Sequence, residues 1–140
     1  GRTDGGPSHM VLDEGAKWLY IVDGGTKRIL RVDITTGTKK RDLTPSAEPI
    51  DEYWEMTGIT QEVFASTGLK EPCGIEIKGD KLFVSDYSTG EIIAYNTATK
   101  AEVARVNSGK PGITGIKIGP DGKIYFVNAL TSEVSRVDPN

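Results

Sequence analysis

The chain is built from short runs of alternating hydrophobic and polar residues that are separated by polar, glycine-containing turns. Three of the runs are rich in aromatic and β-branched residues, namely "WLYIVD" (18–23), "KLFVSD" (81–86) and "KIYFVN" (123–128). Each is followed by a turn and a second run, which is "RILRVD" (28–33), "EIIAYN" (91–96) or "SEVSRVD" (132–138). This pattern predicts β-strands joined by tight turns.

The paired runs recur in register. Asp23, Asp86 and Asn128 end the first run of each pair, and ten residues later Asp33, Asn96 and Asp138 end the second. An earlier run precedes each pair: "SHMVLD" (8–13), "CGIEI" (73–77) or "TGIKIG" (114–119). A fourth run, "AEVARVN" (101–107), follows the second pair, and Gly74 and Gly115 lie 41 residues apart. Four-strand units of about this length are typical of β-propeller blades. We therefore predict an all-β chain with about three four-stranded antiparallel blades.

The first predicted blade is longer than the others, because His9 and Gly74, which hold equivalent positions, lie 65 residues apart. We expect a single propeller segment over 1–140, with blades at about 6–67, 70–107 and 110–140 and an insertion at 42–59. Ser46, followed by Glu48 and Pro49 and an acidic first turn, predicts a short helix near 46–57. We expect the aromatic residues of this insertion to pack back on the blade.

The predicted ring is incomplete. The third blade ends at "SRVDPN" (135–140) without an outer strand, and a closed propeller typically has 4–8 blades. Three blades in an open arc leave an apolar face on each end sheet, and patches of that size are not normally left to water. We therefore expect a larger particle. Either two or more copies close a ring, or the chain is the C-terminal part of a longer or nicked propeller that a companion chain completes.

The units "LYIVDGGTKRILRVD" (19–33), "LFVSDYSTGEIIAYN" (82–96) and "IYFVNALTSEVSRVD" (124–138) resemble NHL-type repeats. The likeness covers 6–140 apart from the insertion. It extends to the six-bladed propellers of the peptidylglycine amidating lyase-like and gluconolactonase-like kind. The resemblance implies a β-propeller, but propellers of this type serve as enzymes, receptors and scaffolds, so the fold alone does not assign a function.

The single histidine, His9, holds the position that Gly74 and Gly115 hold in the other two units. Innermost propeller strands line the central channel, so the glycines would allow close approach there and His9 would project toward the channel. A neutral imidazole is a ligand for Zn, Cu or Fe. In amidating-lyase-like propellers histidines of several inner strands converge on a channel metal, and the position of His9 resembles one of these.

A metal site in this chain would need further ligands, because a metal takes three or four and the chain has one histidine. Other chains, or a two-fold copy of His9 with carboxylates or water, would have to supply them. A hydrogen bond from His9 to a strand carbonyl and a general-base role are the other interpretations. The cofactor that the metal hypothesis implies is a divalent ion (Zn, Cu, Fe or Ca) in the channel.

Asp23, Asp86 and Asn128 stand at the start of turns on one rim of the predicted blades. Asp and Asn side chains accept hydrogen bonds from the backbone two residues on, so we interpret all three as turn-structural residues. Calcium or sugar contacts on the ligand face are the alternative.

Composition narrows the function classes. The chain has 17 Lys+Arg against 20 Asp+Glu and a net charge of −3, without the clustered cations that nucleic-acid binding needs. It holds no apolar run long enough for a membrane span and no GxSxG, P-loop or HExxH motif. Cys73 is the only cysteine, which excludes an intrachain disulfide. Propellers of this kind are often exported, which favours an extracellular or periplasmic location.

Two functions follow. The first is a non-enzymatic ligand- or protein-binding scaffold that assembles with further blades, most simply as a homo-oligomer. Tyr53, Trp54 and Met56 are its candidate contact surface, since aromatic residues and Met are enriched at interfaces; a hydrophobic cap on the blade is the other interpretation of Trp54. The alternative function is a metal-dependent lyase or hydrolase with His9 as a channel metal ligand.

Overall fold

The computed structural model describes residues 6–43 and 54–139, in which every regular element is a β-strand. The strands are β1 (Pro7–Leu12), β2 (Trp18–Asp23), β3 (Arg28–Asp33), β4 (Thr38–Asp42), β5 (Trp54–Thr57), β6 (Thr60–Ala65), β7 (Pro72–Lys78), β8 (Lys81–Asp86), β9 (Glu91–Asn96), β10 (Glu102–Asn107), β11 (Ile113–Ile118), β12 (Ile124–Asn128) and β13 (Glu133–Val137). None of the described residues forms a helix that could cross a bilayer.

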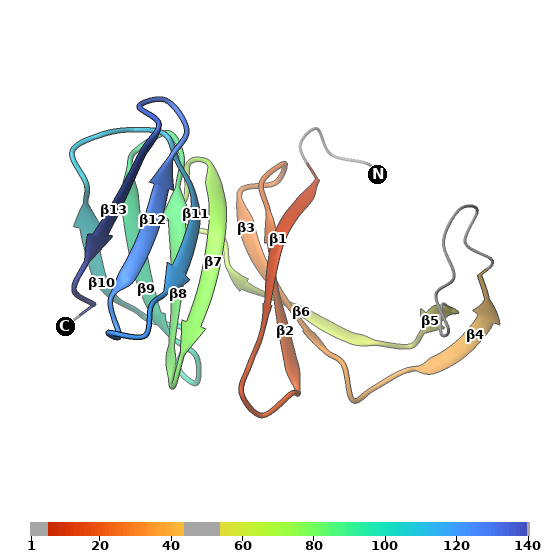
Figure 1. The fold of residues 1–140 in the computed structure, drawn as a ribbon. Coiled ribbons are helices and arrows are strands. Elements are labelled where there is room, and N and C mark those ends of the chain that lie inside the picture. Colours follow the sequence, from red (N-terminus) through yellow and green to blue (C-terminus); the bar gives the residue numbers. More distant parts are fainter. Residues whose placement is uncertain (1–5, 44–53, 140) are drawn as a thin grey trace.

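The strands form four antiparallel sheets. The first sheet has the order β1-β2-β3-β6, the middle sheet β7-β8-β9-β10 and the last sheet β11-β12-β13. Strands β4 and β5 pair with each other and form an arm that extends away from the first sheet (Figure 1). The inner strand β7 lies between β1 and β11, so the inner strands of the three sheets are neighbours. The all-β prediction is confirmed.

The repeat of the sequence is also a repeat of strand register. Tyr20 pairs with Arg31, Phe83 with Ala94, and Tyr125 with Arg136, each at the same place in its sheet. Each inner strand also has a register irregularity at the same place, between Pro7 and Met10, Pro72 and Ile75, or Ile113 and Ile116. Residues at matching positions can therefore be compared directly between the sheets.

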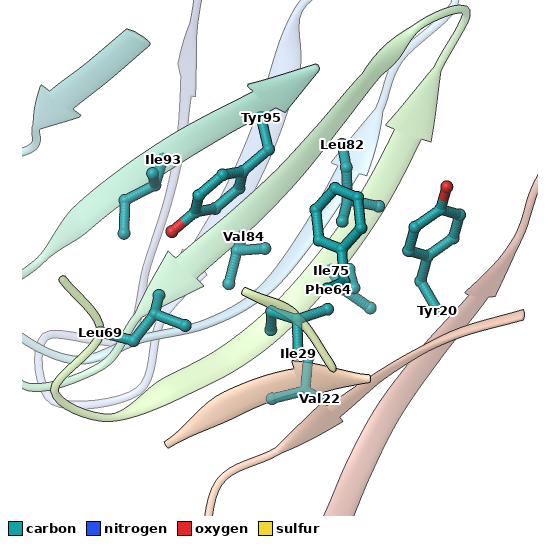
Figure 2. Packing of buried hydrophobic residues seen from close by; sticks show 10 residues of the cluster. All are labelled: Tyr20, Val22, Ile29, Phe64, Leu69, Ile75, Leu82, Val84, Ile93 and Tyr95. Atoms are coloured by element: carbon teal, nitrogen blue, oxygen red, sulfur yellow. The ribbon is translucent and has the colours of Figure 1, made fainter. Parts of the chain in front are cut away.

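Each sheet has a forward face, turned toward the next sheet along the chain, and a backward face, turned the other way. The first core lies between the forward face of the first sheet and the backward face of the middle sheet (Figure 2). It contains Tyr20, Val22, Ile29 and Phe64 from the first sheet, and Ile75, Leu82, Val84, Ile93 and Tyr95 from the middle sheet. The Phe64 ring stacks edge to face on Tyr20 and on Tyr95, with ring centres 5.2 and 5.9 Å apart.

A second core lies between the middle and last sheets. The forward face of the middle sheet contributes Phe83, Ile92 and Ala94, and the backward face of the last sheet contributes Ile113, Ile116 and Ile124. Every one of these side chains is at most 5 % exposed. Successive side chains along each strand of the middle sheet point to opposite faces. The same strands therefore contribute side chains to both cores.

The helix predicted near 46–57 is not present in the described part of that range, and 46–53 lies outside the described residues. Trp54–Thr57 is strand β5. It pairs with β4, where the register joins Trp54 to Asp42 and Met56 to Lys39. The carboxylate of Glu55 also binds Arg41, at 2.6 Å. The backbone N–H and C=O groups of Trp54–Thr57 make their hydrogen bonds with β4. This segment is therefore a strand and does not continue a helix that begins near Ser46.

Candidate functional site

A hollow of about 390 Å³ opens along the inner strands. The inner strands contribute His9, Met10, Ile75, Gly115 and Ile116 to its wall. The forward face of the last sheet contributes Lys117, Tyr125, Val127 and Val134. Most of these side chains are apolar, so the hollow suits an apolar surface better than a small charged ligand.

His9 lies in β1 with its imidazole exposed and in the wall of this hollow. Its Nδ1 is 3.3 Å from the hydroxyl of Ser8. At the matching position of the middle sheet, a Cβ on Gly74 would lie 2.5 Å from the carbonyl oxygen of Thr114 in the last sheet. Only glycine allows β7 and β11 to come so close. The first sheet has the side chain of His9 at this position. Its inner strand β1 therefore cannot come as close to β7 as β7 comes to β11.

Gly115 differs from Gly74, although both were expected to allow close approach. A Cβ on Gly115 would meet only Val127 of its own sheet, at the ordinary contact distance of 3.5 Å. Gly115 lies on the forward face of the last sheet, where the described residues place no further sheet. A glycine at this position thus makes a close backbone contact only where a neighbouring sheet packs on its face.

The metal hypothesis for His9 stays a prediction. Within residues 6–43 and 54–139, no three or more His, Cys, Asp or Glu side chains are grouped closely enough to hold a metal ion. Cys73, the neighbour of Gly74 on β7, is half-buried. Burial, and then the carboxylate of Glu71, raise the pKa of its thiol above the ordinary value, so it is a poor thiolate donor.

The charged groups around the hollow are neutralised by partners. The ammonium of Lys117 lies 2.7 Å from a carboxylate oxygen of Glu76, which is buried. Tyr125 lines the hollow, and its hydroxyl accepts a hydrogen bond at 3.2 Å from Arg136, which also donates to Asp121 at 3.0 Å. These pairs leave the described walls of the hollow without a concentrated charge of either sign.

Asp86 is buried at the start of the turn between β8 and β9. Its Oδ2 accepts the backbone N–H groups of Lys70 and Glu71, at 2.6 and 2.9 Å, and its Oδ1 accepts that of Thr89 and the Ser88 hydroxyl. Burial alone would raise the pKa of this carboxyl, but the donated hydrogen bonds outweigh it and the pKa lies below its ordinary value.

The matching residues Asp23 and Asn128 also accept bonds from the turns that follow them. Asp23 accepts the N–H and the hydroxyl of Thr26 and pairs with Arg28 at 3.1 Å. These bonds, the Thr26 hydroxyl first, hold the pKa of Asp23 below its ordinary value. The oxygen of Asn128 accepts the N–H groups of Leu130 and Thr131, and its amide nitrogen donates to the carbonyl of Pro111 at 2.9 Å. All three side chains face turns and lie outside the hollow.

The two described residues of the predicted contact surface, Trp54 and Met56, do not line the hollow. Trp54 and Met56 are on the arm, and Tyr53 lies outside the described residues. The Trp54 ring is half-buried, with the ammonium of Lys39 5.2 Å from its centre, and it belongs to neither core. The expectation that Trp54 packs back on the blade is therefore wrong, because the arm extends away from the first sheet (Figure 1).

The backward face of the first sheet is an apolar surface whose residues the sequence analysis did not name. We call it the open face. Cross-strand pairs join Met10 to Ile21, Leu12 to Leu19, Leu19 to Val32, Ile21 to Leu30, and Leu30 to Val63. Met10 is 67 % exposed, while Leu12 and Val63 are each 42 % exposed. The signal for it was present in the repeat, since the matching positions of the middle sheet are Ile75, Leu82, Val84 and Ile93.

A smaller groove of about 250 Å³ lies beside β13. It is lined by residues of the second core and by Ala104, Val106 and Val137. In the other two sheets a fourth strand lies at this place, whereas the described part of the last sheet has three strands.

Comparison with known proteins identifies the fold. No family model matches the sequence, and no curated protein matches it. Among solved structures, the chain is similar to a structure of the nidogen–laminin complex, with a TM-score of 0.71 and 15 % identity over 95 % of this chain. It is similar to luciferin-regenerating enzyme, with a TM-score of 0.65 and 16 % identity over 89 % of the chain. For streptogramin B lyase the TM-score is 0.52, with 15 % identity over 99 % of the chain.

These similar proteins are β-propellers, so the chain has a fold of the β-propeller type. The chain spans 43 % of the matched chain of the nidogen–laminin structure, 38 % of luciferin-regenerating enzyme and 53 % of streptogramin B lyase. Both enzymes and binding proteins occur among them. At these identities the likeness establishes the fold alone.

Proposed function

We propose that this chain is a binding segment of a β-propeller, which assembles through its open face with further blades and acts as a scaffold rather than as an enzyme. The observation that carries the proposal is the composition of the open face, where seven apolar side chains lie in register on four strands. These residues are Met10, Leu12, Leu19, Ile21, Leu30, Val32 and Val63. An exposed apolar surface of this extent is characteristic of an interaction site.

The interfaces within the chain support the proposal. The matching residues of the middle sheet, Ile75, Leu82, Val84 and Ile93, are at most 4 % exposed because the first sheet covers them. The open face of the first sheet thus has apolar side chains at the same positions as the covered backward face of the middle sheet. Burial of apolar area contributes about 25 cal/mol per Å², so a further sheet on this face would be stabilised by the same interaction that forms the two cores.

Sedimentation velocity tests the proposal. We expect the protein to sediment as a particle heavier than one chain of 15.1 kDa and to bind little of a dye that reports apolar surface. Replacing Leu30 by Glu should reduce the mass to one chain. A folded wild-type particle of a single chain that binds no dye would contradict the proposal, because the open face would then tolerate water.

A metal-dependent lyase or hydrolase is the second candidate, and the observation that favours it is the place of His9 in the wall of the hollow. Elemental analysis separates the two candidates. Stoichiometric Zn, Cu, Fe or Ca that is lost in His9→Ala, with the fold unchanged, would support the metal-dependent activity. A folded, metal-free wild type that assembles normally would support the scaffold.

A further inference from the structure

The two interfaces inside the chain follow one rule. In the first core the forward face of the first sheet meets the backward face of the middle sheet, and in the second core the forward face of the middle sheet meets the backward face of the last. Two faces are left without a sheet among the described residues. One is the open face, which is a backward face, and the other is the forward face of the last sheet.

The forward face of the last sheet has the side chains that this position has in the other sheets. Tyr125 matches Tyr20 and Phe83, and Val134 matches Ile29 and Ile92 in their paired strands. Yet Val127 is 41 % exposed and Val134 72 % exposed, whereas Tyr20, Phe83, Ile29 and Ile92 are all buried. One uncovered face is therefore a backward face and the other is a forward face, and these are the two types of face that pack against each other within the chain.

An arginine contact at the first interface shows what the forward face can bind. Arg31 lies on the forward face of the first sheet and donates to the carbonyl oxygen of Thr97 in the middle sheet, at 3.1 Å. Arg136 holds the matching position in the last sheet. Ile34 holds the position in the first sheet that Thr97 holds in the middle sheet. The N–H of Ile34 donates to the carbonyl oxygen of Lys17, and the N–H of Thr97 donates to the carbonyl oxygen of Asp80; both acceptors directly precede the second strand of their sheet.

From this complementarity, and resting on the proposed function, we infer that the partner of the open face is the last sheet of a second copy of this chain. Two copies related by a two-fold axis then make two identical forward-to-backward interfaces, and three sheets from each copy give six in a closed ring. The second copy covers the open face, and its Arg136 lies opposite Ile34. The continuity of one packing rule through the molecule is the argument for a second copy over an unrelated partner.

Mixing two variants tests this inference. Leu30→Glu damages the open face and Val134→Glu damages the forward face of the last sheet. Val103→Glu is the matched control, because Val103 is 52 % exposed on β10, away from both faces. We expect the wild type and the control to sediment as two chains and each face variant as one chain. An equimolar mixture of the two face variants should recover the two-chain particle, since one intact face of each kind remains.

Other outcomes contradict the inference in distinguishable ways. If Val134→Glu stays a two-chain particle, the copies pair through the same face, and the head-to-tail ring is wrong while the proposed function stands. The same holds if the wild type assembles but the mixture stays at one chain. A wild type that is a single folded chain and binds the dye would contradict the second copy and leave the proposed function standing. A single folded chain that binds no dye would contradict both. Far-ultraviolet circular dichroism on each variant verifies that the sheets are intact.

Discussion

The first and middle sheets have the same strand order and register, but they differ in how many of their faces another sheet covers. On the backward face of the middle sheet, Leu82 and Val84 are fully buried, whereas Leu19 and Ile21 at the matching positions of the first sheet are only half-buried. The residue types are nearly the same. The difference is that the first sheet covers this face of the middle sheet, whereas no described sheet covers the same face of the first. An apolar sheet face is buried only when a second layer packs on it.

The largest effect is expected from truncating the matched leucines. Leu82→Ala should lower the free energy of unfolding by about 2–5 kcal/mol, as is usual for a buried leucine. Leu19→Ala should cost a similar amount in the assembled wild type, but clearly less in a Leu30→Glu background that does not assemble. Urea unfolding followed by tryptophan fluorescence measures both. Equal costs for Leu19→Ala in the two backgrounds would mean that nothing covers the open face.

The matched glycines Gly74 and Gly115 compare the forward faces of the middle and last sheets. Gly74→Ala should cost about 1–3 kcal/mol, since the added Cβ meets backbone atoms of β11 that cannot move aside. In the same unassembled background, Gly115→Ala should change stability by less than about 0.5 kcal/mol. Thermal or urea unfolding tests this pair. Equal costs at the two positions would refute the close approach of β7 and β11.

A third pair of variants tests the turn residues. Asp86→Asn places an amide against the N–H groups of Lys70 or Glu71, which should cost about 1–3 kcal/mol. Asn128→Asp makes the opposite change and puts a carboxylate oxygen against the carbonyl of Pro111. Both should destabilise the chain in urea. If Asp86→Asn is neutral, the bonds to the loop before β7 contribute nothing to stability.

The lowered pKa of Asp86 also predicts a pH dependence. A carboxyl with a folded-state pKa below its unfolded value contributes stability that is complete above the unfolded value of about 4. That stability is lost as the pH falls through the lowered, folded-state pKa. Urea midpoints measured at neutral and acidic pH should therefore fall less steeply with acid in Asp86→Asn than in the wild type. Parallel pH profiles would contradict the assignment.

The smallest effect is expected at the two ion pairs of Glu62, of which one lies within the first sheet and the other joins it to the middle sheet. Glu62 on β6 accepts bonds from Arg31 and from Lys100, whose ammonium lies 2.8 Å away. Since Glu62 is exposed at 38 %, water and salt screen these pairs. Glu62→Gln should lower stability slightly in dilute buffer, and about 1 M NaCl should remove the difference. A salt-independent loss would indicate a packing role instead.

Much of the fold could be predicted from the sequence, because turn residues and alternation recur at fixed spacing. The strands at 18–23, 28–33, 81–86 and 91–96 appear at those positions. The arm could not be predicted, since the helix-start signal near Ser46 is local while the strand pairing of Trp54–Thr57 depends on a partner, β4, that is earlier in the chain. The open face was expected in general, but its residues emerged only once cross-strand register placed Met10 beside Ile21 and Ile21 beside Leu30.

Oxidation of the two methionines reports whether a second sheet covers the open face. In the single chain Met10 on the open face is 67 % exposed and Met56 on the arm is 36 % exposed. If a second sheet covers the open face, dilute hydrogen peroxide should oxidise Met10 more slowly than Met56, as followed by peptide mass spectrometry, and Leu30→Glu should reverse the order. Faster oxidation of Met10 in the wild type would show that the open face is exposed to water and that no second sheet covers it.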